Sequence, residues 1–156
     1  MISKKNLFGT NKVTQICIVV KDIEKTAADY ADFFGVKKPS ISMTETREKT
    51  HAEFKGEPTD ALAKLAFFRF KNITLELIEP VGSPSTWKEW LDTHGEGVHH
   101  IAFNVRDTKG KVKALADKGI KVVQHGDFRG GQYTYLDGTG PLKIVLELLG
   151  NDTEKR

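Results

Sequence analysis

The stretch HIAFNV, residues 100–105, repeats the pattern of QICIVV, residues 15–20. Because side chains alternate across a strand, each stretch separates into two faces. When the two stretches are aligned, Gln15 and His100 hold equivalent positions, and the opposite face of each stretch is apolar. An apolar face of this kind suits packing beneath a helix. The sequence therefore predicts two copies of one strand, each with a polar residue at the same place.

A second pair of related strands is ITLELIEP, residues 73–80, and KIVLELLG, residues 143–150. Glu76 and Glu147 lie in the middle of these strands, flanked by leucines, on the face opposite to the apolar set. Ionisable residues are rarely buried without a partner, because an unpaired buried charge is costly. We therefore expect both glutamates to have a compensating partner.

A helix is predicted after each of the first strands. The first helix begins after Asp22, whose carboxylate can accept hydrogen bonds from the first-turn amides, and ends at Gly35. The second begins at Asp107 and ends at Gly119. Further strand patterns follow each helix, so each half is β-α-β-β-β, which indicates an internal duplication.

These elements predict one domain over residues 1–156 with an α+β fold. Module one covers about residues 13–80, a linker helix about residues 84–95, and module two about residues 98–149. The length of 156 residues suits a single domain made of two such modules.

The composition excludes several classes of protein. Hydrophobic residues make up 38% and charged residues 29%, a balance typical of a globular core. The net charge is only +3 and there is no block of like charges, so we expect no nucleic-acid binding. No apolar run approaches the ~18 residues that a membrane span needs, and no signal-peptide core is recognisable. We expect a cytoplasmic protein without a membrane partner.

Some chemically suggestive residues have simpler interpretations. The single cysteine, Cys17, excludes an intrachain disulfide and a Cys-rich zinc site, and it lies in an apolar strand where a small core residue is expected. Trp87 and Trp90 share one face of the linker helix, which favours packing over ligand stacking. His99 is next to His100 and points to the opposite face of a regular strand. We expect His99 to pack, or to support a ligand, and not to bind a metal itself.

Gln15, Glu76, His100 and Glu147 form the candidate site. A pseudo-twofold relationship between the halves would bring all four together. Their oxygen and nitrogen donors, without a thiolate, suit a divalent ion such as Co, Mn, Ni, Zn or Fe. The alternative is four unrelated polar residues on a solvated face of the sheet, but their equivalent register in both halves favours a shared site.

Several segments carry a family resemblance. They are VTQICIVVKDIEKTAADYADFFG, ITLELIEP, GEGVHHIAFNV and LKIVLELL, between residues 13 and 149. These segments resemble the vicinal oxygen chelate superfamily, also called the glyoxalase, bleomycin-resistance and dioxygenase superfamily. Within it, WLDTHGEGVHHIAFNV, residues 90–105, is most similar to methylmalonyl-CoA epimerases.

The resemblance implies two βαβββ modules that form a cupped mixed sheet around a divalent metal ion. It implies that His100 and Glu147 are the metal ligands of the second module and that Glu76 is a ligand of the first. Gln15 occupies the fourth position, where the epimerases usually have His. It further implies a homodimer.

The implied reaction is epimerisation of a CoA thioester by removal of its α-proton, with stabilisation of the enolate and Glu147 as the base. The epimerases use a second glutamate from the middle of the first module, but neither Glu53 nor Glu57 clearly matches that motif. The partner expected is a small-molecule thioester.

Two alternatives remain open at this stage. Gln, Glu, His and Glu in this order are also the ligands of the zinc-dependent type of glyoxalase I, which isomerises a glutathione hemithioacetal. Other members of the superfamily lack a metal and bind a small molecule in the cup.

Overall fold

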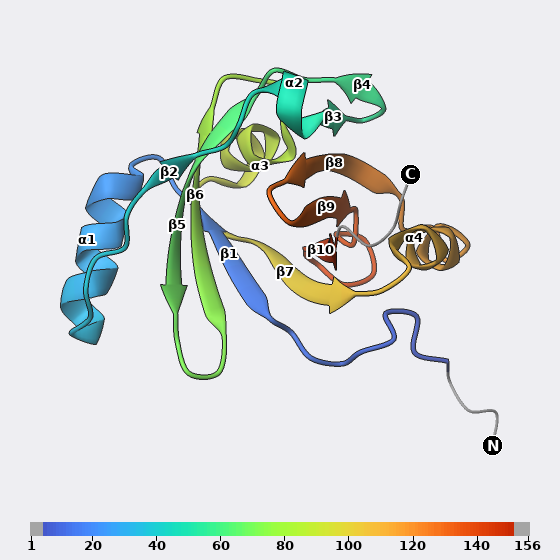
Figure 1. The fold of residues 1–156 in the computed structure, drawn as a ribbon, viewed down its shortest axis with the longest axis horizontal. Helices are drawn as coiled ribbons and strands as arrows, with labels where there is room; N and C mark the ends of the chain where they lie inside the picture. The colour runs from blue at the N-terminus through green and yellow to red at the C-terminus, as the bar shows by residue number, and fades with distance from the viewer. Residues whose placement is uncertain (1–4, 152–156) are drawn as a thin grey trace.

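The computed structural model describes residues 5–151 of the chain (Figure 1). The first half contains β1 (Gln15–Val19), α1 (Ile23–Phe34), β2 (Ser42–Met43), α2 (Arg47–Thr50), β3 (Glu53–Phe54), β4 (Glu57–Pro58), β5 (Leu62–Arg69) and β6 (Thr74–Val81). After α3 (Thr86–His94), the second half contains β7 (Gly97–Val105), α4 (Thr108–Ala116), β8 (Val122–Phe128), β9 (Gly131–Leu136) and β10 (Val145–Asn151).

Within residues 5–151, the halves join edge to edge in one ten-stranded sheet with the order β2-β5-β6-β1-β7-β10-β9-β8-β3-β4. Strand β1 pairs in parallel with β6, and β7 pairs in parallel with β10. The junction is the antiparallel pairing of β1 with β7. The sheet curls strongly, as Figure 1 shows. This mixed, cupped sheet with few helices confirms the predicted α+β fold class.

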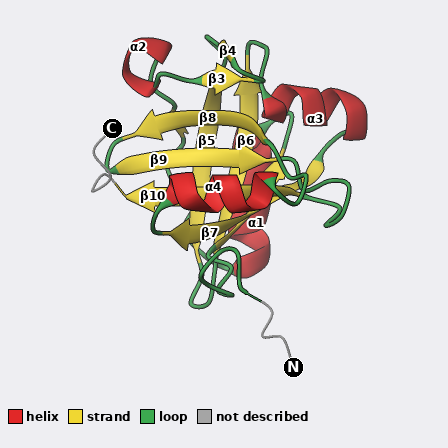
Figure 2. Ribbon diagram, turned by 90° about the vertical axis from the view of Figure 1, so that its right-hand side faces the viewer, coloured by secondary structure: helices red, strands yellow, loops and turns green. Residues whose placement is uncertain are grey.

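The two main helices begin at residues that the sequence predicted. Asp22 accepts a hydrogen bond from the Lys25 amide at the start of α1, and Gly35 ends this helix with a left-handed φ of 61°. Asp107 caps α4 in the same way, by accepting from the Gly110 amide. Helix α4 contacts β10 and lies in front of this part of the sheet in Figure 2. Within residues 5–151, no helix is long and apolar enough to span a membrane.

Strands β3 and β4 leave the first half and extend the far edge of the second. Strand β3 pairs with β8, where Glu53 lies opposite His125. The Glu53 Oε2 atom is 3.0 Å from His125 Nε2, and His51 Nδ1 is 3.0 Å from Asp127 Oδ2. Glu53 and His125 are 72 positions apart in the chain, and no local pattern predicts such a pairing. Its physical basis is the open edge of β8, whose backbone N–H and C=O groups need partners.

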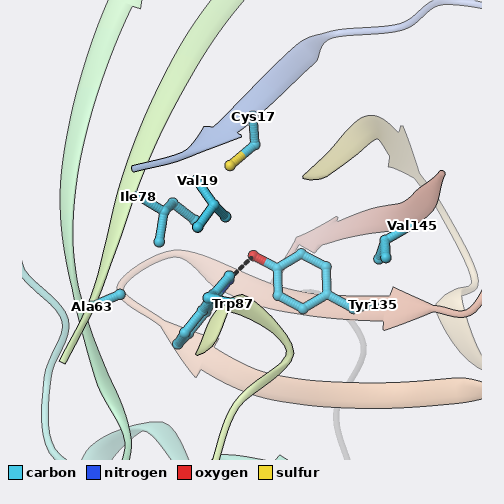
Figure 3. Packing of buried hydrophobic residues seen from close by; sticks show 7 residues of the cluster. All are labelled: Cys17, Val19, Ala63, Ile78, Trp87, Tyr135 and Val145. Atoms are coloured by element: carbon cyan, nitrogen blue, oxygen red, sulfur yellow. Dashed lines mark hydrogen bonds between the residues drawn. The ribbon is translucent and has the colours of Figure 1, made fainter. Parts of the chain in front are cut away.

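Both halves contribute to a cluster of buried residues inside the curl (Figure 3). Its members are Cys17, Val19, Ala63, Ile78, Trp87, Tyr135 and Val145. Cys17 is fully buried, as expected of a small core residue. Trp87 packs here too, and its indole N–H donates to the Tyr135 hydroxyl over 3.1 Å. The candidate site lies next to this cluster.

Candidate functional site

Four polar side chains from adjacent strands converge inside the curl. Gln15 Nε2 lies 2.6 Å from Glu76 Oε2 and 3.3 Å from Glu147 Oε2. His100 Nε2 lies 3.0 Å from Glu147 Oε2 and 3.4 Å from Glu76 Oε2. The structure thus brings together the four residues that the sequence singled out, and we call them the quartet.

Strand register explains this convergence. Glu76 lies opposite Cys17 across β6 and β1, and Cys17 lies opposite His100 across β1 and β7. On the other side of β7, Glu147 of β10 lies opposite Ala102. A shift of one residue in any of these strands would turn its polar side chain to the other face of the sheet.

The quartet is almost sealed from solvent: His100 is 0% exposed, Glu147 4%, Glu76 5% and Gln15 9%. Burial raises the pKa of Glu76 above its ordinary value of 4.5. Burial alone would lower the pKa of His100, but the Glu147 carboxylate 3.0 Å from its Nε2 atom favours the protonated ring, and the pKa is raised above the ordinary 6.5. Two buried carboxylates therefore share one imidazole, and this arrangement favours an added positive charge.

The donor set fits a divalent metal ion. Ligand atoms of Glu76, His100 and Glu147 all lie within 4.8 Å of one another. One ion with metal–ligand bonds of about 2.0–2.2 Å can reach all three. The Gln15 amide turns its nitrogen toward the carboxylates, and a half-turn of this amide would offer the neutral oxygen Oε1 instead. Carboxylate, amide and imidazole donors suit ions such as Zn or Mn.

A cavity of about 630 Å³ opens onto the quartet. Gln15, Glu76 and Glu147 line it, together with an apolar and aromatic wall formed by Leu65, Phe67, Ile78, Trp87, Tyr133 and Tyr135. Trp87 thus belongs to the core and also borders the cavity. Concave, mostly apolar cavities of this size with a few convergent polar groups are typical of small-molecule sites.

Two arginines that the sequence analysis did not single out also line this cavity, Arg69 and Arg129. Both are exposed, and the Arg69 guanidinium lies 5.7 Å from the centre of the Phe67 ring. Leu65, Phe67 and Arg69 alternate along β5 and all border the cavity. This alternation could have identified Arg69, whereas Arg129 lies in a turn that has no periodic signal.

Two further carboxylates border the cavity, Glu45 and Asp127. The glutamates considered from the sequence as a second base lie elsewhere. Glu53 and Glu57 belong to β3 and β4 at the far edge of the sheet, and Glu53 pairs with His125.

His99 departs from the expected geometry because strand β7 is not regular. Cys17 lies opposite His100 and Ile18 lies opposite Val98, so the register shifts and His99 has no partner on β1. Such β-bulges re-aim side chains and are frequent near active sites. The prediction that His99 points away from His100 is therefore wrong: the Nδ1 atoms of the two rings are 2.9 Å apart. Burial lowers the pKa of His99 well below 6.5, and the adjacent His100 is the second cause of this shift.

Comparison with known families agrees with this geometry. The family model described as the Glyoxalase/Bleomycin resistance protein/Dioxygenase superfamily matches residues 14–135. The chain belongs to this superfamily. The match contains three members of the quartet, and it confirms the resemblance that the repeated strands indicated.

Relatives of this superfamily member include proteins with and without a known activity. The uncharacterized protein YqjC of Bacillus subtilis is 36% identical over 113 residues, which are 72% of this chain and 71% of the relative. An ethylmalonyl-CoA/methylmalonyl-CoA epimerase of Cereibacter sphaeroides is 24% identical over 117 residues, 74% of this chain and 77% of the relative.

A variant of the Streptomyces coelicolor methylmalonyl-CoA epimerase, in complex with 2-nitronate-propionyl-CoA, has a related structure. The TM-score is 0.61 at 22% identity, over 90% of this chain and 97% of that one. At this identity the likeness shows a shared fold.

Proposed function

We propose that this protein is a metal-dependent epimerase that acts on a CoA thioester of the methylmalonyl type. The observation that carries the proposal is the convergence of two buried carboxylates and one imidazole at the wall of a small-molecule cavity. The epimerase relatives named above support the choice of reaction.

Glu76, His100, Glu147 and, after its amide turns, Gln15 would hold the metal ion. When bound, a divalent ion supplies Lewis-acid polarisation of the thioester carbonyl, which makes the proton at C2 more acidic. Glu147 takes this proton, and the electron pair of the C–H bond moves into the enolate. Glu147 is suited to this step because its carboxylate lines the cavity in which the substrate would bind.

Inversion at C2 requires that a proton returns to the opposite face of the enolate. A second acid on the cavity wall can donate it, and Glu45 and Asp127 are the remaining carboxylates that border the cavity. The second acid then regains its proton from solvent, while Glu147 releases the one that it took. The cycle thus leaves the substrate inverted and the enzyme unchanged.

Arg69 and Arg129 would bind anionic groups of the substrate at the opening of the cavity. A guanidinium matches carboxylate and phosphate oxygens in a bidentate geometry. The phosphates of a CoA thioester meet this requirement, and so do the carboxylates of a glutathione adduct.

The second candidate is the isomerisation of a glutathione hemithioacetal, as in glyoxalase I. The specific observation in its favour is Gln15, because Gln, Glu, His and Glu in this chain order match the zinc-dependent type of that enzyme. Both reactions begin with removal of a proton from a carbon next to a carbonyl group, so the same quartet could catalyse either reaction.

Proton exchange at C2 of methylmalonyl-CoA tests the proposal. The metal-loaded protein is incubated with the thioester in heavy water, and deuterium uptake is followed by mass spectrometry. We expect uptake in the wild type, loss of more than about 100-fold in Glu147→Gln, and unchanged uptake in Glu57→Gln, a matched change outside the cavity.

Each other result overturns the proposal in a distinct way. Bound metal without exchange, combined with turnover of the hemithioacetal, would select the glyoxalase reaction. A protein that binds no divalent ion and exchanges no proton would instead be a metal-free binding protein.

A further inference from the structure

His99 connects the linker helix α3 with the quartet. Its Nε2 atom lies 3.1 Å from the Thr86 hydroxyl oxygen, and its Nδ1 atom lies 2.9 Å from His100 Nδ1. His99 and His100 are fully buried, and Thr86 is 7% exposed. The rings of Trp90 and Tyr135 contact the His99 ring edge-on. Their centres lie 5.4 Å and 5.6 Å, respectively, from the centre of the His99 ring. The imidazole of His99 is therefore fixed in both position and plane.

The bulge in β7 is what makes this contact possible. In a regular strand His99 and His100 would point to opposite faces. Because His99 is the extra residue between the pairs Cys17–His100 and Ile18–Val98, its side chain turns toward the His100 ring.

Counting protons gives the direction of the hydrogen bonds. Two ring nitrogens 2.9 Å apart share one proton, so one donates and the other accepts. His100 faces the carboxylates with Nε2, and this nitrogen must be free of a proton to bind a metal ion. The proton of the neutral His100 ring then lies on Nδ1 and is donated to Nδ1 of His99. The remaining His99 proton lies on Nε2 and is donated to the Thr86 hydroxyl oxygen.

We infer that His99 is a positioning residue: it accepts the Nδ1 proton of His100 and so fixes Nε2 of His100 as the metal-binding atom. The inference rests on the proposed metal site. Thr86 completes the chain, so the linker helix, which belongs to neither repeated half, helps to set the geometry of the quartet. Ligating histidines commonly use such a partner on their second nitrogen, and its loss typically weakens metal binding about 10- to 100-fold.

Two amide variants separate this role from packing. In His99→Asn, Oδ1 has the same number of bonds to Cα as Nδ1 of His, so the acceptor toward His100 is kept. In His99→Gln, the terminal nitrogen replaces Nε2, so the contact with Thr86 can be kept, but the acceptor toward His100 is lost. We expect zinc affinity, measured by competition with a chelating dye, to stay within about threefold of the wild type in the Asn variant. We expect a fall of about 10- to 100-fold in the Gln variant.

The tautomer of His99 gives a second readout that needs neither activity nor metal. In the wild type, long-range proton–nitrogen NMR spectra of the imidazoles should show His99 protonated at Nε2 only, with and without zinc. Thr86→Val, which removes the acceptor with little change of volume, should alter this spectrum and weaken zinc binding. Circular dichroism and thermal unfolding establish that each variant is folded.

The outcomes distinguish this inference from the proposed function. Equal zinc affinity in the Gln variant and the wild type would overturn the inference alone, as would a His99 ring protonated at Nδ1. A wild type that binds neither zinc nor any other divalent ion would overturn the proposed function, and the tautomer would still decide the role of His99.

Discussion

Gln15 donates a hydrogen bond of 2.6 Å to the Glu76 carboxylate, although the two residues are 61 positions apart in the chain. They meet because the first strand of the first half, β1, pairs in parallel with the last, β6. Parallel neighbours require a long connection between them. His100 and Glu147 are brought together in the same way by β7 and β10. The quartet therefore exists only when both halves are folded and joined.

The Gln15 amide should stabilise the metal-free protein. Gln15→Ala removes a donor to two buried carboxylates, so we expect the free energy of unfolding to fall by about 1–3 kcal/mol. Urea denaturation at pH 7 with a chelator measures this. Gln132→Ala, a half-buried glutamine of β9, should change it by about 0.5 kcal/mol or less. Equal effects in the two variants would mean that the Gln15 hydrogen bonds contribute nothing.

Glu76 should make the metal-free fold less stable as pH rises. Burial raises its pKa in the folded protein above the ordinary 4.5. A carboxyl group with a raised folded pKa contributes stability fully below pH 4.5 and loses this contribution as pH rises through the folded pKa. The free energy of unfolding of the wild type relative to Glu76→Gln should therefore decrease with increasing pH above 4.5. Denaturation curves at several pH values, with chelator, test this, and two parallel pH profiles would contradict it.

Cys17 should be inert in the native protein. It is 0% exposed, and burial raises its pKa to about 12. At pH 8 only about one such thiol in 10⁴ is ionised, against about one in ten for a pKa of 9.0. A disulfide reagent such as DTNB should modify no thiol in native buffer and one per chain in guanidinium chloride. Rapid stoichiometric modification of the folded protein would show that Cys17 is accessible.

Arg69 should contribute to binding of the anionic part of the substrate. Arg69→Ala removes a guanidinium from the cavity, and we expect CoA to bind about tenfold more weakly, as for the loss of one charge-assisted hydrogen bond. Isothermal titration with CoA measures the Kd. Arg106→Ala removes the same charge outside the residues that line the cavity. A similar loss in both variants would indicate a general electrostatic effect.

Leu77 should contribute strongly to the stability of the first half. It is 0% exposed and packs with α1 residues in the cluster beneath β6. Leu77→Ala should lower the free energy of unfolding by about 2–5 kcal/mol, because it removes buried methyl groups and leaves a cavity. Leu142→Ala makes the same change at a residue that is 49% exposed, and should cost about 0.5 kcal/mol or less. Comparable losses in a denaturant titration would contradict the assigned core.

Local patterns in the sequence were sufficient for a large part of this protein. Alternation along QICIVV and HIAFNV separated the helix-covered face from the polar face, and so identified Gln15 and His100. The mid-strand positions of Glu76 and Glu147 identified the other two members of the quartet. Asp22 and Gly35 predicted the ends of α1 because their capping chemistry is local. Each of these signals depends only on residues close together in the chain.

Tertiary structure alone decided how the strands pair and where the irregularities lie. Strand β3 pairs with β8 and so provides hydrogen-bond partners for an edge strand that is distant in the chain. No pattern within residues 51–54 predicts this pairing. The bulge at His99 follows from the register between β1 and β7, so the contact between His99 and His100 could not be predicted from alternation. Arg129 and Arg69 line the same cavity because the sheet curls. These features are set by hydrogen bonds between strands that are distant in the chain, and these bonds depend on which strands become neighbours in the folded protein. Local sequence patterns therefore determined which residues supply the polar groups of the site. The tertiary structure determined which other residues surround them.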